Sequence, residues 1–339
     1  MSWNSLPEIA NGMVEKGRGI LAADESTPTC TKRFDSIGVE STEANRNAYR
    51  DMLFTTSGME EFISGVILFD ETLRQSTLKD GTPFPEYLTN LNVIPGIKVD
   101  KGAHPLSGTE GEKVTEGLDG LDARLKEYYE LGARFAKWRA VITISESEPS
   151  GTCVTANAHA LARYAALCQE NGIVPIVEPE ILMDGSHTAE DSFVVTEEVL
   201  HSVFYELYGQ NVLLEGMVLK PNMVLSGYKC SEQASVDEVA EMTVTVLKRC
   251  VPSAVPGIAF LSGGQSNEDA TAHLNSMNRI LGNSSPWNLT YSYGRALQAS
   301  ALDTWSGKEE NVPAAQDAFY KRAKLNSLAT KADYSEDME

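Results

Sequence analysis

The chain has 339 residues, 48 of them acidic and 28 of them Lys or Arg, which gives a formal net charge of −20 at pH 7. Nucleic acids and anionic membrane surfaces attract basic proteins, so this charge argues against both as general partners. No apolar run has the length of a signal peptide core or a membrane span, and the five cysteines lack the paired spacing of a disulfide framework or a zinc site. These features predict a cytoplasmic globular protein.

Eight short apolar runs, each closing on a polar or charged residue, recur along the chain and are typical of buried strands. They are expected at residues 19–25, 65–70, 93–100, 133–139, 173–180, 212–220, 257–264 and 289–295. Segments with helical periodicity separate them, and an extra helix is expected near 43–53. Strands alternating with helices predict an α/β fold, a (β/α)8 TIM barrel, formed by one domain over residues 1–339 with a short acidic tail at about 330–339.

The run at residues 212–220 ends on a lysine. Pro221 cannot continue a strand's hydrogen-bond ladder, so Lys220 is expected at the carboxyl end of its strand, where a loop begins. Side chains alternate along a strand, and Lys220 would therefore share a face with Leu214, Gly216 and Val218. Taken alone, such a lysine is more often a solvated residue of an edge strand.

Acidic, basic or hydroxyl side chains end six of the expected strands, where apolar residues are the rule. These residues are Asp24, Lys98, Lys137, Arg139, Glu178, Glu180, Lys220 and Ser262. A parallel barrel brings the carboxyl ends of its strands to one mouth, which is where barrel enzymes carry out their chemistry. The sequence therefore predicts that these side chains meet.

Three lysines among carboxylates indicate covalent amine chemistry. A lysine attacks a carbonyl carbon only as the neutral amine, which burial and a neighbouring cation both favour. Lys220 is the expected nucleophile and Lys137 the neighbouring cation, while Glu178 and Asp24 are candidates for proton transfer. The competing interpretation is a buried ion pair between Lys137 and Glu178 that only stabilises the barrel.

Two elements after the last two strands have the features of phosphate sites. Ser262, Gly263 and Gly264 expose backbone N–H groups just before a helix, and Gly294 with Arg295 repeats the arrangement one strand later. Across the mouth, a second phosphate is expected at Lys98, Arg139 and the loop of residues 26–29. The five histidines have neither HxH nor HExxH spacing, so no metal site is expected.

The sequence resembles class I, Schiff-base fructose-bisphosphate aldolases from about residue 17 to residue 328. The motifs that carry the resemblance include GRGILAADES, PGIKVDKG, FAKWR, NGIVPIVEPEIL, LLEGMVLKPNMV, FLSGGQS and SYGRALQAS. The resemblance implies reversible cleavage of fructose 1,6-bisphosphate to dihydroxyacetone phosphate and glyceraldehyde 3-phosphate, in glycolysis and gluconeogenesis. It also implies a cytoplasmic homotetramer that needs no metal or other cofactor.

Residue roles follow from the same resemblance. Lys220 matches the Schiff-base lysine, Glu178 the acid and base for carbinolamine dehydration, and Asp24 the residue at the C4 hydroxyl. Lys137 matches the cation beside the nucleophile and Glu180 the supporting carboxylate. The phosphate ligands implied are Ser262, Gly263, Gly294 and Arg295 at the dihydroxyacetone-phosphate end, and Lys98, Arg139, Ser26 and Thr29 at the other end.

Two positions depart from the family pattern. Animal members carry serine where this chain has Thr29, and animal and plant members end on a tyrosine that Tyr334 does not match. The resemblance therefore assigns Tyr334 no role in proton transfer. Two alternatives stay open: another Schiff-base aldolase that acts on sugars with one phosphate, and a non-catalytic scaffold that keeps the fold to bind proteins.

Overall fold

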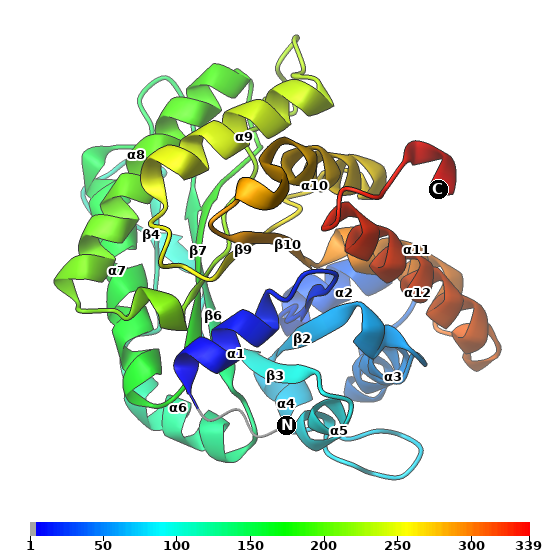
Figure 1. Cartoon of the computed structure of the whole chain (residues 1–339). Coiled ribbons are helices and arrows are strands. Elements are labelled where there is room, and N and C mark those ends of the chain that lie inside the picture. The colour runs from blue at the N-terminus through cyan, green and yellow to red at the C-terminus, as the bar shows by residue number, and fades with distance from the viewer. Residues whose placement is uncertain (1–4) are drawn as a thin grey trace.

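Eight parallel strands close into a barrel in the computed structural model, which describes residues 5–339 (Figure 1). Around the barrel they are β1 (Gly19–Ala23), β2 (Ile63–Leu68), β3 (Ile94–Lys98), β6 (Phe135–Ile142), β7 (Val174–Ile181), β8 (Val218–Leu219), β9 (Gly257–Phe260) and β10 (Asn288–Tyr293), which pairs with β1. The eight-stranded barrel predicted from the alternation of strands and helices is confirmed.

Helices surround the barrel (Figure 1). They are α1 (Leu6–Met13), α2 (Thr27–Asp35), α3 (Glu43–Phe54), α4 (Asp70–Leu73), α5 (Phe84–Asn90), α6 (Leu121–Glu130), α7 (Gly151–Glu170), α8 (Ala189–Gly209), α9 (Val236–Cys250), α10 (Asn267–Leu281), α11 (Arg295–Trp305) and α12 (Val312–Ala329). Short 3-10 helices lie at Met59–Glu61, Leu214–Gly216, Gly282–Ser284, Glu309–Asn311 and Glu336–Met338. The extra helix predicted near residues 43–53 is α3. None of the helices described is long and apolar enough to span a bilayer.

Apolar side chains fill the barrel and one helix covers its amino end. Ile20, Ile67, Phe135 and Ile176 belong to one buried cluster with Met13 of α1. Phe135 needs the space beside β3, because a Cβ on Gly96 would lie 2.2 Å from its ring. Among the described residues, apolar side chains therefore fill the barrel below its mouth, and barrels of this kind hold their ligands at the carboxyl ends of the strands.

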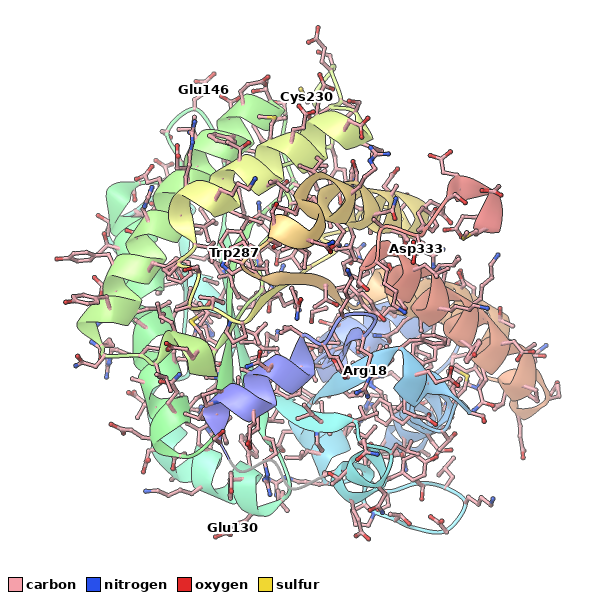
Figure 2. The ribbon with its side chains drawn as sticks, in the orientation of Figure 1. Arg18, Glu130, Glu146, Cys230, Trp287 and Asp333 are labelled. Carbon is pink, nitrogen blue, oxygen red and sulfur yellow. The ribbon has the colours of Figure 1, made fainter. Side chains whose placement is uncertain are left out.

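Polar contacts fasten the amino end of the barrel. Arg18 precedes β1 and is labelled in Figure 2. It donates from Nη2 to the carbonyl oxygens of Ile63 (2.8 Å) and Asn92 (3.1 Å), at the starts of β2 and β3. Thr290 of β10 donates its hydroxyl to the Arg18 carbonyl at 2.6 Å. One arginine thus joins four neighbouring strands on the face opposite the mouth.

The strand predicted over residues 212–220 is wrong in its first part. Leu214–Gly216 forms a 3-10 helix, and only Val218–Leu219 is a strand. The Gln169 side chain explains the difference, since it bonds the backbone N–H of Leu213 (2.8 Å) and the carbonyls of Leu213 (2.8 Å) and Gly216 (3.1 Å). The Lys220 N–H still donates to the Val177 carbonyl at 2.8 Å, so the lysine remains at the end of a barrel strand.

Two stretches between barrel strands contain further regular structure. Residues 73–92 include α5, and residues 102–115 form a hairpin of β4 (Ala103–Pro105) and β5 (Lys113–Thr115). The acidic tail packs against the barrel's helices: Tyr334 is buried, and Arg322 of α12 pairs with Glu339 at 2.5 Å. These segments are additions to the outside of the barrel.

Candidate active site

A cavity of about 590 Å³ opens at the carboxyl ends of the barrel strands. All thirteen residues that the sequence nominates for catalysis or phosphate binding line it: Asp24, Ser26, Thr29, Lys98, Lys137, Arg139, Glu178, Glu180, Lys220, Ser262, Gly263, Gly294 and Arg295. The predicted convergence of strand ends at one mouth therefore occurs.

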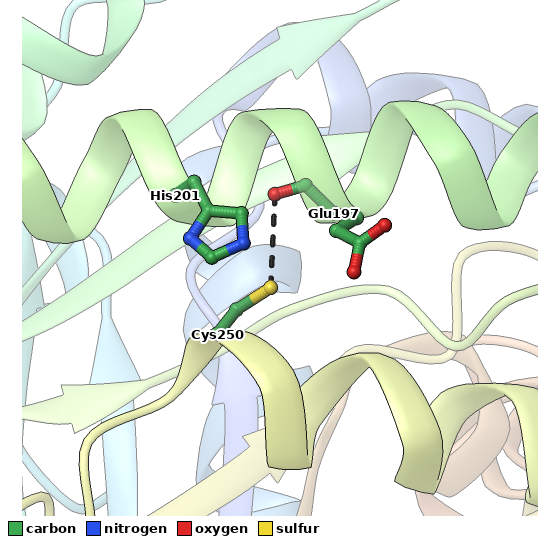
Figure 3. A group of neighbouring side chains, drawn as sticks. All are labelled: Glu197, His201 and Cys250. Atoms are coloured by element: carbon green, nitrogen blue, oxygen red, sulfur yellow. Dashed lines mark hydrogen bonds between the residues drawn. The ribbon is translucent and has the colours of Figure 1, made fainter.

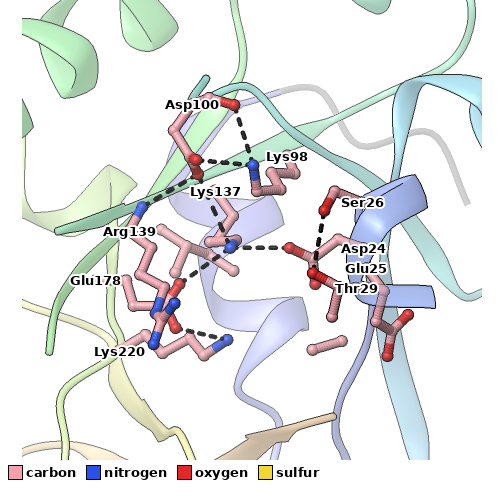
Figure 4. Close-up of polar contacts among 12 residues, drawn as sticks. Asp24, Glu25, Ser26, Thr29, Lys98, Asp100, Lys137, Arg139, Glu178 and Lys220 are labelled. Carbon is pink, nitrogen blue, oxygen red and sulfur yellow. Dashed lines mark hydrogen bonds and ion pairs between the residues drawn. The ribbon is translucent and has the colours of Figure 1, made fainter. Parts of the chain in front are cut away.

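A chain of ion pairs occupies the centre of the cavity (Figure 4). Lys220 Nζ lies 3.1 Å from Glu178 Oε1, and Lys137 Nζ lies 3.4 Å from Glu178 Oε2. Lys137 also pairs with Asp24 Oδ2 at 2.8 Å. Glu178 thus bridges two lysines, and the carboxylate of Asp24 stands on the far side of Lys137.

The pKa values of this cluster follow from burial and from the charges around each group. Burial alone would raise the pKa of Asp24, but the neighbouring ammonium group of Lys137, with which it is paired, outweighs it and holds that pKa well below its usual range. Burial would lower the pKa of Lys137, yet the carboxylates of Asp24 and Glu178 raise it well above its usual range. At neutral pH, Lys137 is therefore a permanent cation and Asp24 a permanent anion.

Asp100 orients the basic side chains on the β3 side of the mouth. Its carboxylate pairs with Lys98 at 2.7 Å and lies 3.9 Å from Lys137, and it accepts a hydrogen bond from the Gly102 N–H at 3.2 Å. Arg139 is paired with Glu180 on β7 in the same region. The two cations next to the β3 and β6 ends are thus held in place before a substrate arrives.

On the side of the mouth formed by the ends of β9 and β10, two glycines lie beside an arginine that has no ion-pair partner among the described residues. Gly263 and Gly264 have φ angles of +61° and +107°, which only glycine adopts without strain. Arg295 is the first residue of α11 and, within the described residues, its guanidinium has no ion-pair partner. Backbone N–H groups and an unpaired guanidinium beside them are suited to a phosphate group.

Comparison with known proteins shows the family of this chain. The family model described as "Fructose-bisphosphate aldolase class-I" matches residues 5–339. The chain belongs to the class I fructose-bisphosphate aldolase family. It is therefore a carbon–carbon lyase, which cleaves fructose 1,6-bisphosphate reversibly to dihydroxyacetone phosphate and glyceraldehyde 3-phosphate.

Relatives from bacteria, plants and a parasite carry aldolase names. A Xanthomonas axonopodis protein named "Probable fructose-bisphosphate aldolase class 1" is 61% identical over 97% of this chain and 98% of its own length. Arabidopsis thaliana "Fructose-bisphosphate aldolase 6, cytosolic" is 58% identical over 95% of this chain and 89% of its own. A solved structure of Plasmodium falciparum fructose-bisphosphate aldolase, in complex with TRAP and an inhibitor, has a TM-score of 0.95, with 53% identity over 97% of this chain and 95% of that one.

The sequence did not nominate several residues of this aldolase cavity that follow Thr29 in the chain. Lys32 and Arg33 on α2, and Ser36 just after it, also line the cavity, next to Glu25. Arg33 is paired with Glu25, which also accepts from Arg50 at 2.7 Å. These residues follow helical spacing just after β1, so the periodicity of α2 could have revealed them.

One group outside the mouth has the atom types of a metal site. Among residues 5–339, Glu197, His201 and Cys250 on α8 and α9 bring three potential ligand atoms within 4.8 Å of one another (Figure 3). The Cys250 thiol donates to the Glu197 carbonyl at 3.7 Å, and burial raises the pKa of that thiol to about 11. The Glu197 carboxylate is paired with Arg249 at 3.0 Å. A protonated thiol and an engaged carboxylate favour a helix-packing contact over a metal site.

Proposed function

We propose that Lys220 is the Schiff-base nucleophile of this aldolase. The supporting observation is its position: its side chain is buried at the end of β8, 3.1 Å from a carboxylate that a second lysine also contacts. Attack of the neutral amine on the C2 carbonyl of the substrate gives a carbinolamine. Loss of hydroxide as water then needs a proton, and Glu178 is the acid within reach.

Cleavage of the C3–C4 bond follows from the iminium that Lys220 forms. The iminium accepts the electron pair of the breaking bond and becomes an enamine, while the C4 hydroxyl loses its proton as the aldehyde forms. Asp24, ionised at neutral pH, is the group proposed at that hydroxyl. Lys137 keeps Asp24 and Glu178 oriented, and Glu180 holds Arg139.

Two phosphate sites define the proposed substrate. Ser262, Gly263, Gly294 and Arg295 bind the phosphate of the dihydroxyacetone end, and Lys98, Arg139, Ser26 and Thr29 bind the other. The Ser26 and Thr29 hydroxyls, 3.0 Å apart, lie at the start of α2, where the helix dipole favours an anion. Cations at both ends of the mouth offset the −20 charge of the chain for a substrate with two phosphates.

The family and the relatives' names support further proposals about the whole protein. These are one catalytic domain over residues 1–339, a homotetramer, a cytoplasmic location and a reaction without metal or other cofactor. The Arabidopsis relative is named as cytosolic.

Steady-state kinetics test the proposal. Lys220→Met should abolish cleavage of fructose 1,6-bisphosphate, while Lys126→Met, at an exposed lysine of α6, should leave the rate unchanged. Turnover of fructose 1-phosphate at a rate equal to that of the bisphosphate would favour an aldolase for substrates with one phosphate. A Lys220→Met variant that retained the wild-type rate would exclude Schiff-base catalysis at this residue.

A further inference from the structure

Tyr228 reaches the glycine loop of the mouth from a neighbouring loop. It lies between β8 and α9, and its hydroxyl donates to the Gly263 carbonyl at 3.1 Å. A Cβ on Gly264 would lie 2.2 Å from the Tyr228 hydroxyl and 2.6 Å from Arg295 Nη2, so both groups border the same glycine. Neither the strand-end pattern nor the family motifs nominate this tyrosine.

The backbone around Tyr228 is held against the loop that follows β7. The N–H groups of residues 227, 228 and 229 donate to the carbonyls of His187 (2.9 Å), Met183 (2.9 Å) and Gly185 (2.8 Å). The Tyr228 hydroxyl also lies 3.7 Å from Met183 Sδ. Although the residue is about half exposed, three backbone hydrogen bonds fix the point from which its ring extends.

The hydrogen bond to the Gly263 carbonyl determines where the next N–H points. In a trans peptide the C=O and N–H groups point in opposite directions, so a carbonyl turned toward Tyr228 directs the Gly264 N–H away from it. Both glycines have positive φ angles, and glycine imposes little preference of its own on the peptide between them. The orientation therefore depends on an external contact.

Tyr228 can act as the donor in its hydrogen bond to the Gly263 carbonyl at neutral pH. Burial raises the pKa of Tyr228 despite the nearby Arg295 guanidinium, so the hydroxyl keeps its proton at neutral pH. The Gly263 carbonyl accepts a hydrogen bond from this hydroxyl, whereas Arg295 beside it stays available for an anion. The Tyr228 hydroxyl therefore binds the glycine loop, while the Arg295 guanidinium is left to bind the ligand.

We propose that Tyr228 is a positioning residue for the phosphate of dihydroxyacetone phosphate. Its hydroxyl fixes the peptide between Gly263 and Gly264 so that the Gly264 N–H faces the phosphate beside Arg295. The inference rests on the proposed assignment of this loop to the dihydroxyacetone end. It makes Tyr228 specific to one of the two phosphates, because Tyr228 contacts the loop that follows β9, whereas Lys98 ends β3 on the opposite side of the barrel.

The condensation direction tests this assignment, since each phosphate then arrives on a separate substrate. Tyr228→Phe keeps the ring and removes the donor, and it should raise the KM for dihydroxyacetone phosphate by about three- to tenfold, the range of one hydrogen bond. The KM for glyceraldehyde 3-phosphate and kcat should stay within about twofold. Tyr208→Phe, at an 84% exposed tyrosine of α8, is the matched control and should change neither KM.

Other results would overturn the assignment. An unchanged KM for dihydroxyacetone phosphate, or an equal rise for both substrates, would show that Tyr228 does not act on this phosphate alone. A fall of more than a few degrees in the melting temperature of Tyr228→Phe would give it a structural role instead. Borohydride trapping on Lys220 in the wild type separates this outcome from failure of the proposed mechanism, because trapping does not depend on the Tyr228 hydroxyl.

Discussion

Lys137 offers the sharpest test of the charge network at the mouth. Its ammonium group lies 2.8 Å from Asp24, 3.4 Å from Glu178 and 3.9 Å from Asp100, and its side chain is only 5% exposed. At an effective dielectric constant of about 20, the attraction is about 6 kcal/mol at the shortest of these distances. Desolvation of the buried charges offsets several kcal/mol of that attraction.

Lys137→Met removes the cation and leaves three carboxylates near one another. We expect the free energy of unfolding at pH 7 to fall by about 3–5 kcal/mol, the usual cost of breaking a buried pair. Urea unfolding followed by circular dichroism measures it. The control is Lys126→Met, because Lys126 pairs with Asp122 at 2.7 Å on the surface of α6, where an ion pair contributes about 0.5 kcal/mol or less. Equal losses for the two variants would refute the argument that burial makes the Lys137 network strong.

Three further predictions concern proton transfer, acid stability and metals. Glu178→Gln should lower kcat by about 10²- to 10⁴-fold, because the amide cannot protonate the departing hydroxyl. Rapid-quench kinetics should show slow formation of the iminium. Iminium formation at the wild-type rate would exclude Glu178 as the acid. The pKa of Asp24 is lowered in the folded state, so its contribution to stability is complete above the unfolded pKa of about 3.9 and is lost as the pH falls below it. The difference in unfolding free energy between wild type and Asp24→Asn, measured by urea titration, should therefore shrink below pH 4. A difference that stayed constant with pH would contradict the lowered pKa. Dialysis against EDTA should leave the cleavage rate unchanged, whereas a loss that zinc restores would require a metal.

The barrel and its mouth could be predicted because both follow from local pattern. Each apolar run ends on a polar residue, and a parallel barrel must bring those ends together, which places Lys137, Glu178 and Lys220 in one cavity. The pattern of strand ends predicts which residues lie at the mouth without any knowledge of the loops. It gives neither the distances between their side chains nor the protonation states of their groups.

Features that depend on contacts between distant segments could not be predicted from the sequence. The 3-10 helix at Leu214–Gly216 forms because Gln169, on α7, bonds its backbone, and no local signal marks that pairing. Tyr228 meets Gly263 through two loops whose register is set by backbone hydrogen bonds. Arg33 lines the mouth from a helix, a position that the pattern of strand ends does not mark.

Borohydride reduction in the presence of dihydroxyacetone phosphate tests the central claim most directly. The imine between Lys220 and the C2 carbon would be reduced to a stable amine, and mass spectrometry with peptide mapping would locate it. We predict one adduct for each chain, on the peptide that contains Lys220, and none in Lys220→Met. An adduct on Lys98 or Lys137, or no adduct in an active enzyme, would contradict the assignment of Lys220 as the nucleophile.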